Sequence, residues 1–556
     1  MARPPSRRSH YPSAGRARLV VTRSKTRESR NELPQNPEQI VAALELFLAE
    51  FPAAVVREDG KVLFDMREAK YSLSTEHGRC TLHLWGADRN LVRRVGAATL
   101  RSKTLRLSTY RFGQTKPQSL ELAGDRDRRT PSTRETTRVR FVKLLERVLE
   151  REFSGWKPEA FRTAMDLEKS FGPAYARGLL VQGQKAWAVI GINEEEAPAT
   201  IDGILTFGIL WLQNCRESGG GRRLVQGLKL VVPRGMGVLT LSRLPWLSGE
   251  SSKWELWELS EKTEEFLQRD PADQGNLHTH LVHAPDVSAA QERFAPGAAR
   301  VLSLVPEAQK SVIEQRLRSG VEYAFLLHGL EFARIRIGAA ADSFNRVEQI
   351  TFGAGANETP LTESNEAQLR DLVARLCERR SPTGDKRDPL FRMQPERWLE
   401  GELRREVTLL DTRLDPAHVY TQVAAFAAGD RGMLDLLSIT DDGRLAVLEL
   451  KADEDPQLAL QGLDYWVRVR WHHMQHPDGR SGLGEFQRHG YFGGVPLSSG
   501  PPRLFLVAPA LRVHPATEIV LRHFSSRVEW SLLALDERWR DHIKVVWRKR
   551  STDPPR

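Results

Sequence analysis

The chain has 556 residues, which exceeds what one hydrophobic core can organise and predicts about three domains. Apolar residues make up 40% of it, and no stretch approaches the roughly 18 uninterrupted apolar residues of a membrane-spanning helix, so we expect a soluble protein. The formal net charge of +10 indicates an acidic partner. The three cysteines are widely spaced and odd in number, which is typical of a reducing compartment and argues against a disulfide framework.

The positive charge is concentrated at the start of the chain. Nine basic residues stand there against Glu28 alone, and the rest of the chain is nearly neutral. Residues 1–35 are therefore predicted to form a disordered basic tail, which either holds nucleic acid through counterion release or is a solvated tail without function. The sole apolar run in this region, Leu19-Val20-Val21, is too short for a signal peptide, so we expect a cytoplasmic protein.

Two α+β domains are predicted before residue 346. Residues 36–125 begin with an amphipathic helix that opens at Asn36-Pro37, and two hairpins follow it. Residues 135–345 begin with a second helix and continue through apolar runs that resemble strands, in a fold that the pattern does not identify. A helix and a charged linker are expected over 346–394.

The last domain, residues 395–556, alternates helices and strands in the order α-β-β-β-α-β, with one further helix and strand. Hairpin strands followed by a helical crossover to another strand predict a mixed sheet with helices on both faces. We therefore expect a multidomain protein of the α/β (α+β) class. The predicted helices span 395–411, 456–470 and 515–525, and the predicted strands span 417–426, 432–440, 444–452, 503–509 and 527–534.

One hairpin of this domain carries charged residues among apolar ones. A loop made of Asp441-Asp442-Gly443 joins its strands and places Asp435 opposite Glu449. Opposed side chains lie roughly 5 Å apart at Cβ. Because side chains alternate along a strand, Lys451 shares the face of Glu449. A two-residue loop would instead send the two carboxylates to opposite faces of the sheet.

The charged residues of this hairpin need a physical reason, because Glu449 lies within an apolar run. Two close carboxylates in a partly buried place cannot both stay ionised without a compensating cation. Mg²⁺ or Mn²⁺ commonly takes one or two carboxylates plus phosphate and water, so Asp435 and Glu449 are predicted metal ligands. Such a metal activates an attacking water, and the ammonium of Lys451 orients that water or meets the developing negative charge. The pattern indicates phosphodiester hydrolysis.

Two helices are expected to complete the site. The helix after the Lys451 strand carries Gln461 and Tyr465 at positions i and i+4, hence on one face, and its N-terminus favours a phosphate. On the helix before the hairpin, a helical wheel places Glu402 at the margin of the buried face, Glu406 within it and Glu400 nearer the opposite flank. We expect Glu402 or Glu406 to reach the metal.

The last third of the chain resembles the PD-(D/E)xK, or restriction-endonuclease-like, superfamily, and is most similar to its RecB-like and NucS-like nucleases. The resemblance rests on an acidic helix followed by Asp435, Glu449-Leu450-Lys451 and Gln461-x-x-x-Tyr465. It implies that Asp435 and Glu449 bind the metal and that Lys451 is the catalytic lysine. It further implies that Gln461 and Tyr465 form the helix pair, with Glu402 as the first-helix acid. Leu434 departs from the pattern, because it stands where the motif has proline.

The combined pattern predicts a metal-dependent nuclease that prefers DNA and cuts it as an endo- or exonuclease. Its upstream domains would select the substrate, in DNA repair, restriction or defence against mobile elements. The alternative is a nuclease-like fold that binds nucleic acid or docks a protein without cutting. A third hypothesis places the main activity in the upstream domains. The oligomeric state stays open, and a homodimer is compatible with the sequence.

Three other segments are weaker candidates. His278, His280 and His283 resemble a metal cluster but have no neighbour that completes the shell, so we expect an exposed strand or loop. If the helix continues, His472 and His476 lie one turn apart, where contact with nucleic-acid phosphate is favoured over metal binding. Gly219-Gly220-Gly221 lacks the ending of a phosphate loop and predicts a flexible turn.

Overall fold

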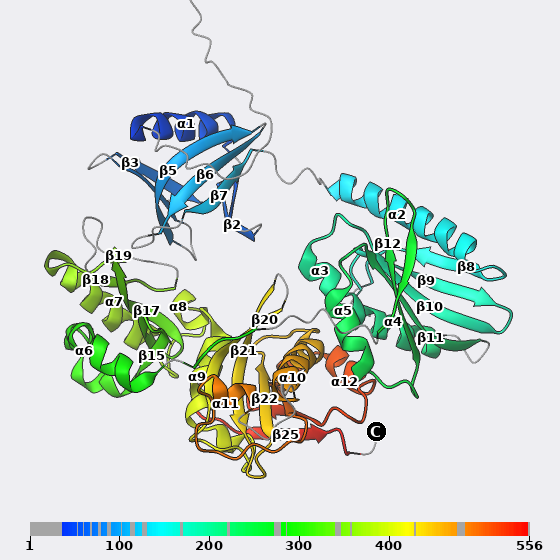
Figure 1. Cartoon of the computed structure of the whole chain (residues 1–556). Coiled ribbons are helices and arrows are strands. Elements are labelled where there is room, and N and C mark those ends of the chain that lie inside the picture. Colours follow the sequence, from blue (N-terminus) through cyan, green and yellow to red (C-terminus); the bar gives the residue numbers. More distant parts are fainter. Residues whose placement is uncertain are drawn as a thin grey trace, which may run out of the picture.

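The computed structural model describes residues 36–553, apart from gaps at 53, 59–60, 67–68, 76–78, 86–89, 102, 112–116, 125–130, 167–170, 219–222, 272–279, 285, 340–345, 356–358, 428–429 and 475–483. In this part the chain forms four β-sheets with accompanying helices (Figure 1). The protein is thus a mixed α and β chain with several sheets, as predicted. The expected basic tail, 1–35, lies outside the described residues. No helix among the described residues is long and apolar enough to cross a membrane.

The N-terminal unit is a seven-stranded antiparallel sheet in the order β2-β1-β7-β6-β5-β4-β3. Helix α1 (Pro37–Glu50) lies over it (Figure 1) and buries Ile40, Leu44 and Phe47, which recur at helical spacing. The Asn36 side chain accepts a hydrogen bond from the N–H of Glu38 and caps the helix. The strands are β1 (Val55–Glu58), β2 (Lys61–Asp65), β3 (Lys70–Ser74), β4 (Cys80–Trp85), β5 (Asn90–Arg101), β6 (Thr104–Tyr110) and β7 (Gln118–Ala123).

The second unit is a six-stranded mixed sheet in the order β13-β12-β11-β10-β9-β8, with β10, β11 and β12 parallel. Helix α2 (Pro131–Glu152) packs on the face that carries Trp187 and Val189, and α4 (Ile204–Ser218) packs on the face of Ala188 and Ile190. The other elements are β8 (Lys157–Arg162), β9 (Tyr175–Gln182), β10 (Lys185–Ile192), α3 (Pro198–Asp202), β11 (Leu224–Pro233), α5 (Val238–Arg243), β12 (Lys253–Leu259) and β13 (Phe266–Arg269).

The third unit is a five-stranded antiparallel sheet, β15-β16-β17-β18-β19, that shares a core with helices α6 (Val287–Ser303) and α7 (Glu366–Arg379). The sequence-based division placed 135–345 in one domain. In the structure, β8 to β13 of this range form one sheet, β15 to β17 belong to another with a separate core, and β14 (His280–Leu281) pairs within the C-terminal sheet. Both halves are rich in apolar strands, so no change of composition marks the boundary. The elements are β15 (Ile313–Ser319), β16 (Glu322–Leu327), β17 (Leu330–Ala339), β18 (Arg346–Phe352), β19 (Thr359–Pro360) and α8 (Pro389–Arg392).

The C-terminal unit contains a seven-stranded mixed sheet in the order β14-β20-β21-β22-β23-β24-β25. Each helix and strand predicted here has a counterpart, and β14, α11 and β25 are additional. Strand β14 comes from far upstream and pairs with β20. The elements are β14 (His280–Leu281), α9 (Pro395–Arg405), β20 (Tyr420–Ala427), β21 (Asp430–Ile439), β22 (Leu445–Leu450), α10 (Leu458–Met474), α11 (Glu485–Arg488), β23 (Arg503–Pro509), α12 (Pro515–Leu521), β24 (Trp530–Leu535) and β25 (Val545–Arg550).

Helices cover both faces of this C-terminal sheet, as the sequence predicts. Leu436 and Leu448 pack on the side of α9, whereas Leu437 and Val447 pack on the side of α10 and α12. The α10 side continues into the apolar core of the second unit, where α10 contacts α5 and α12 contacts α4 (Figure 1). The second and C-terminal units are therefore joined by a shared core.

Candidate active site

The hairpin of β21 and β22 has the register that a three-residue loop predicts. Ile439 pairs with Leu445, and Leu436 pairs with Leu448. Continued by one residue, this register sets Asp435 and Glu449 on the α10 side of the sheet, and alternation puts Lys451 there as well. The predicted juxtaposition of the three charged groups is therefore present in the structure.

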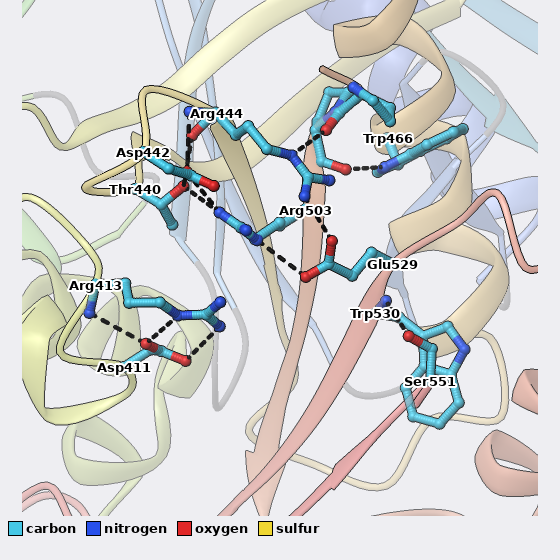
Figure 2. Close-up of polar contacts among 12 residues, drawn as sticks. Asp411, Arg413, Thr440, Asp442, Arg444, Trp466, Arg503, Glu529, Trp530 and Ser551 are labelled. Atoms are coloured by element: carbon cyan, nitrogen blue, oxygen red, sulfur yellow. Dashed lines mark hydrogen bonds and ion pairs between the residues drawn. The ribbon is translucent and has the colours of Figure 1, made fainter. Parts of the chain in front are cut away.

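A network of charged side chains holds the turn of this hairpin (Figure 2). Asp442 accepts hydrogen bonds from the hydroxyl of Thr440 and from Arg503, each at 2.7 Å. Arg503 also donates to Glu529 at 3.0 Å, and Glu529 accepts from Arg444 at 2.6 Å. The hydrogen bond from Arg503 holds the pKa of Asp442 well below its usual range, so this carboxylate stays ionised. The network fixes the loop at three residues and thereby fixes the register.

The two strands separate beyond Leu436 and Leu448, where their paired register ends. Hydrogen-bonded pairs alternate along an antiparallel ladder, so the next bonded pair would join Leu434 to Leu450. The N–H of Leu450 donates to Oδ2 of Asp435 instead, at 3.0 Å. The Asp435 carboxylate therefore stands at a fork between the strands, where a ligand can approach it.

Glu449 is completely buried, with 0% of its surface exposed. Its Oε2 atom has no hydrogen-bond partner among the described residues. Burial, and then the neighbouring Asp435, raises the pKa of Glu449 well above its usual value. A buried carboxylate oxygen without a partner is unfavourable, and a cation bound at that oxygen would offset the cost.

Lys451 is 7% exposed, and its Nζ lies 3.0 Å from Oε1 of Glu449. Glu396 of α9 approaches the same Nζ to 3.8 Å. Burial lowers the pKa of Lys451, but the carboxylates of Glu449 and Glu396 outweigh burial and the pKa is raised. The side chain of Lys451 consequently stays protonated and positively charged at neutral pH.

Asp435 titrates differently from an ordinary aspartate. Burial raises its pKa to about 6, although the N–H of Leu450 and the ammonium of Lys451 act in the opposite direction. Glu400 and Glu396 add to the increase. Both carboxyls of the hairpin thus bind a proton more tightly than ordinary acids do.

The helix before the hairpin contributes a different acid from the expected one. Oε1 of Glu402 lies 3.2 Å from Nδ1 of His328 in the third unit, and Glu406 is the exposed C-cap residue of α9. Glu396, in the first turn of α9, is instead the acid beside Lys451. The wheel placed the leucines of the helix correctly but the acids wrongly: Glu406 is exposed because the helix ends at Arg405, and Glu400 is buried. It also does not tell which end of the helix lies over the charged strand ends.

Gln461 and Tyr465 lie on one face of α10, as the spacing predicts, and Gln461 Nε2 donates to the Tyr465 hydroxyl at 3.3 Å. Tyr465 is 9% exposed. Burial, and then the charge of Glu449, raises the pKa of Tyr465, so its phenol stays neutral. The helix pair therefore offers a neutral hydroxyl close to the two carboxylates.

A pocket of about 460 Å³ gives access to Asp435 from solvent. It lies between the third and the C-terminal units. The third unit lines it with Arg318, Gly329, Glu331, Arg334 and Gly355, and the C-terminal unit lines it with Gln394, Pro395, Glu396, Arg397, Asp435 and Asp453. The sequence did not indicate that the third unit borders the site, because its arginines stand more than 60 residues before the α9 helix.

The weaker candidates add nothing to this site. His278, His476 and Gly219-Gly220-Gly221 lie outside the described residues. His280 is exposed in β14, and His472 Nδ1 lies 2.6 Å from the carboxylate of Glu485. Throughout the described part of the chain, no group of three or more His, Cys, Asp or Glu side chains is placed to hold a metal ion. The candidate centre offers two carboxylates, those of Asp435 and Glu449.

No family model and no curated protein matches the sequence. Among solved structures, a repair endonuclease from Pyrococcus abyssi is 13% identical, with a TM-score of 0.16, and the match covers 41% of this chain and 97% of that one. EndoMS in a complex with double-stranded DNA is 12% identical, with a TM-score of 0.17 and coverage of 41% and 95%.

Proposed function

We propose that the chain is a metal-dependent nuclease that hydrolyses phosphodiester bonds, with DNA as its substrate, at a PD-(D/E)xK centre in its C-terminal unit. The observation that carries the proposal is the unpartnered Oε2 of Glu449, which is fully buried beside a second carboxylate and an ammonium. The order α9-β20-β21-β22-α10-β23 supports it as well, because a restriction-endonuclease-like core has this sequence of helices and strands.

The residues present fit a divalent cation of the Mg²⁺ or Mn²⁺ type. Such ions use hard oxygen ligands and commonly take one or two carboxylates, with phosphate and water as the remaining ligands. Asp435 and Glu449 would hold the ion, and the pocket beside Asp435 leaves room for the phosphate and water. When bound, the ion activates water and stabilises negative charge on the phosphoryl oxygens.

Side chains of the protein supply the hydrogen-bond donors that the reaction also needs. The Lys451 ammonium, held by Glu449, donates a hydrogen bond to the attacking water or to the phosphoryl oxygen on which charge develops. Glu396 keeps a second negative charge near this ammonium. Gln461 orients the Tyr465 hydroxyl, which contributes a neutral donor.

The test is a cleavage assay with the full chain. Plasmid, linear duplex, single-stranded DNA and RNA are incubated with Mg²⁺, Mn²⁺ or EDTA, beside the variants Asp435→Ala, Glu449→Gln and Lys451→Ala. We expect cleavage of DNA that requires the metal and falls by on the order of 100-fold or more in each variant.

Asp441→Asn is the matched control, since it removes an exposed carboxylate from the turn of the same hairpin. It should cut like the wild type. Wild-type protein that binds nucleic acid without cutting it under any metal condition would support the binding module instead. Cleavage that survives in Lys451→Ala and Asp435→Ala would place the activity elsewhere in the chain.

A further inference from the structure

The wall of the pocket opposite Asp435 belongs to the third unit. Arg318 of β15 and Arg334 of β17 line it, and Arg397 of α9 lines the neighbouring side. The side chains of Arg318 and Arg334 are 26% and 25% exposed. Guanidinium groups at the mouth of a pocket that contains a carboxylate fork present donors to a negatively charged ligand.

Among the three arginines of the pocket, Arg318 has the longest ion-pair contact. Its Nη2 lies 3.4 Å from Oε2 of Glu331, whereas Arg334 contacts the same carboxylate at 2.6 Å. Burial lowers the pKa of Arg318, and the nearby charges of Arg316 and Arg397 lower it further, whereas Glu331 and Glu400 raise it. The guanidinium of Arg318 thus has a long ion-pair contact and lines the pocket, so an anion that enters the pocket can reach it.

The first turn of α9 adds a second feature that favours anions. Gln394, Pro395, Glu396 and Arg397 line the pocket. The N-cap residue Gln394 makes no side-chain capping hydrogen bond. The first turn of this 11-residue helix thus brings the positive end of the helix dipole to the pocket.

The wall is held rigidly against the C-terminal unit. Arg316 of β15 donates to Glu400 of α9 at 2.8 Å, and Glu400 is 1% exposed. Arg380 is completely buried, stacks over the ring of Trp398 at 4.8 Å, and donates to the carbonyl of His328 at 2.8 Å. Because these contacts join the third unit to α9, the donors of the wall are preorganised with respect to Asp435.

We propose that the third unit supplies a phosphate-binding wall, with Arg318 as its principal donor, that holds the backbone of the nucleic-acid strand presented to Asp435. The inference rests on the proposed nuclease function and deepens it. The phosphate bound by Arg318 is a neighbour of the scissile phosphate along the same strand. Arg318 is a positioning residue in this arrangement, and the third unit is part of the substrate site.

The test measures binding without cleavage. Fluorescently labelled single-stranded and duplex DNA of 20 nucleotides or base pairs, lengths of roughly one to two contact sites, are titrated with full-length protein in EDTA at several salt concentrations. We expect Arg318→Gln to weaken binding about 10-fold and to reduce the slope of log K against log salt by about 1. Arg318→Lys, which keeps the charge but not the planar fork, should recover part of the loss.

Arg336→Gln is the matched control, because Arg336 pairs with Glu322 on the same sheet and does not line the pocket. It should keep the wild-type affinity and salt slope. Equal affinities and slopes for the Arg318 and Arg336 variants would overturn the inference, as would wild-type protein that binds neither DNA. If the wild-type protein binds DNA but never cuts it, the proposed nuclease function is wrong. The comparison of the Arg318 and Arg336 variants would still test whether the third unit binds phosphate.

Discussion

The negative charge that Asp435 needs to bind a cation destabilises the folded protein. Its pKa rises from the ordinary 3.8 to about 6, mainly through burial, so the folded protein holds the proton more tightly than the unfolded chain does. Its contribution therefore favours folding most below pH 3.8 and is lost as the pH rises to about 6. Above that pH, keeping Asp435 ionised costs about 3 kcal/mol.

Asp435→Asn should accordingly stabilise the metal-free protein at pH 8, because the amide oxygen still accepts the Leu450 N–H but carries no charge. The gain is on the order of 1 to 3 kcal/mol, and it should shrink toward pH 4, where the wild-type carboxyl is protonated. The midpoint of urea unfolding in EDTA measures it.

Mn²⁺ provides the second half of this test. It should raise the unfolding midpoint of the wild type at pH 8 and leave that of Asp435→Asn nearly unchanged, since the metal binds only the folded, ionised site. Asp441→Asn should behave like the wild type in both buffers. A Mn²⁺ effect of equal size in the wild type and in Asp435→Asn would contradict the assignment of Asp435 as a ligand.

At the same scale, the sequence predicted the three charged residues of the hairpin but not the acid from the helix. Asp435, Glu449 and Lys451 follow from local rules, namely the loop length and the alternation of side chains. Glu396 depends on the direction in which α9 crosses the sheet, and that direction is set by distant contacts such as Arg316 with Glu400. Helical periodicity does not contain this information.

At the scale of elements, the close packing of α10 on β22 and β23 depends on Gly462. A Cβ at this position would lie 2.5 Å from Cδ2 of Leu506, 3.2 Å from Cδ1 of Leu504 and 3.5 Å from Cβ of Glu449. Glycine therefore lets the helix that carries Gln461 and Tyr465 approach the carboxylates.

Gly462→Ala should destabilise the C-terminal unit by about 1 to 3 kcal/mol through overpacking, less the gain in helix propensity of about 1 kcal/mol. It should also reduce cleavage, because α10 or Glu449 must move. Gly401→Ala on α9 is the comparison, since its added Cβ meets only Glu314 at 3.5 Å. Thermal unfolding and cleavage rates are measured for both variants. A Gly462→Ala protein as stable and active as Gly401→Ala would contradict the requirement for glycine at position 462.

The elements of the C-terminal unit were largely predictable, since long apolar runs and clear turns separate them. Three additions, β14, α11 and β25, were not predicted as parts of this unit, although a strand or loop was expected around His280. The two residues of β14 have no strand pattern of their own and become a strand only by pairing with β20. An interaction across this distance in the chain leaves no local signal.

On the scale of the whole molecule, the second unit is fastened to the site helix by a buried ion pair. Arg243 of α5 is 5% exposed, and its Nε donates to Oδ1 of Asp464 at 2.6 Å, next to Tyr465 in the sequence. Trp246 packs edge-on against Trp466 of the same helix, with ring centroids 4.8 Å apart. Both contacts join the second unit directly to α10.

Asp464→Asn should destabilise the protein by about 3 to 5 kcal/mol, because it leaves a buried guanidinium without its counterion. The double variant Arg243→Met with Asp464→Leu replaces both charges by apolar groups and should recover most of the stability. Thermal unfolding of the three proteins measures the effect. A single variant as stable as the wild type, or a double variant as unstable as the single one, would show that the pair does not hold the interface.

The arrangement of the units could not be predicted from the sequence for a related reason. The patterns of 135–345 identify strands but not which strands share a sheet, and the third unit approaches the site only through tertiary contacts such as that of Arg380 with His328. The neighbourhood of Asp435 is thus assembled from parts of the chain whose proximity is a property of the complete fold.

Strand β14 pairs with Ala425 and Phe426 at the outer edge of β20, and α10 packs against the second unit. A fragment that begins at residue 395 would keep every residue of the proposed catalytic centre, yet it would expose an open row of main-chain donors and acceptors together with a large apolar helix face. Such surfaces recruit other chains. Excising the domain would therefore yield an aggregating protein rather than a minimal enzyme.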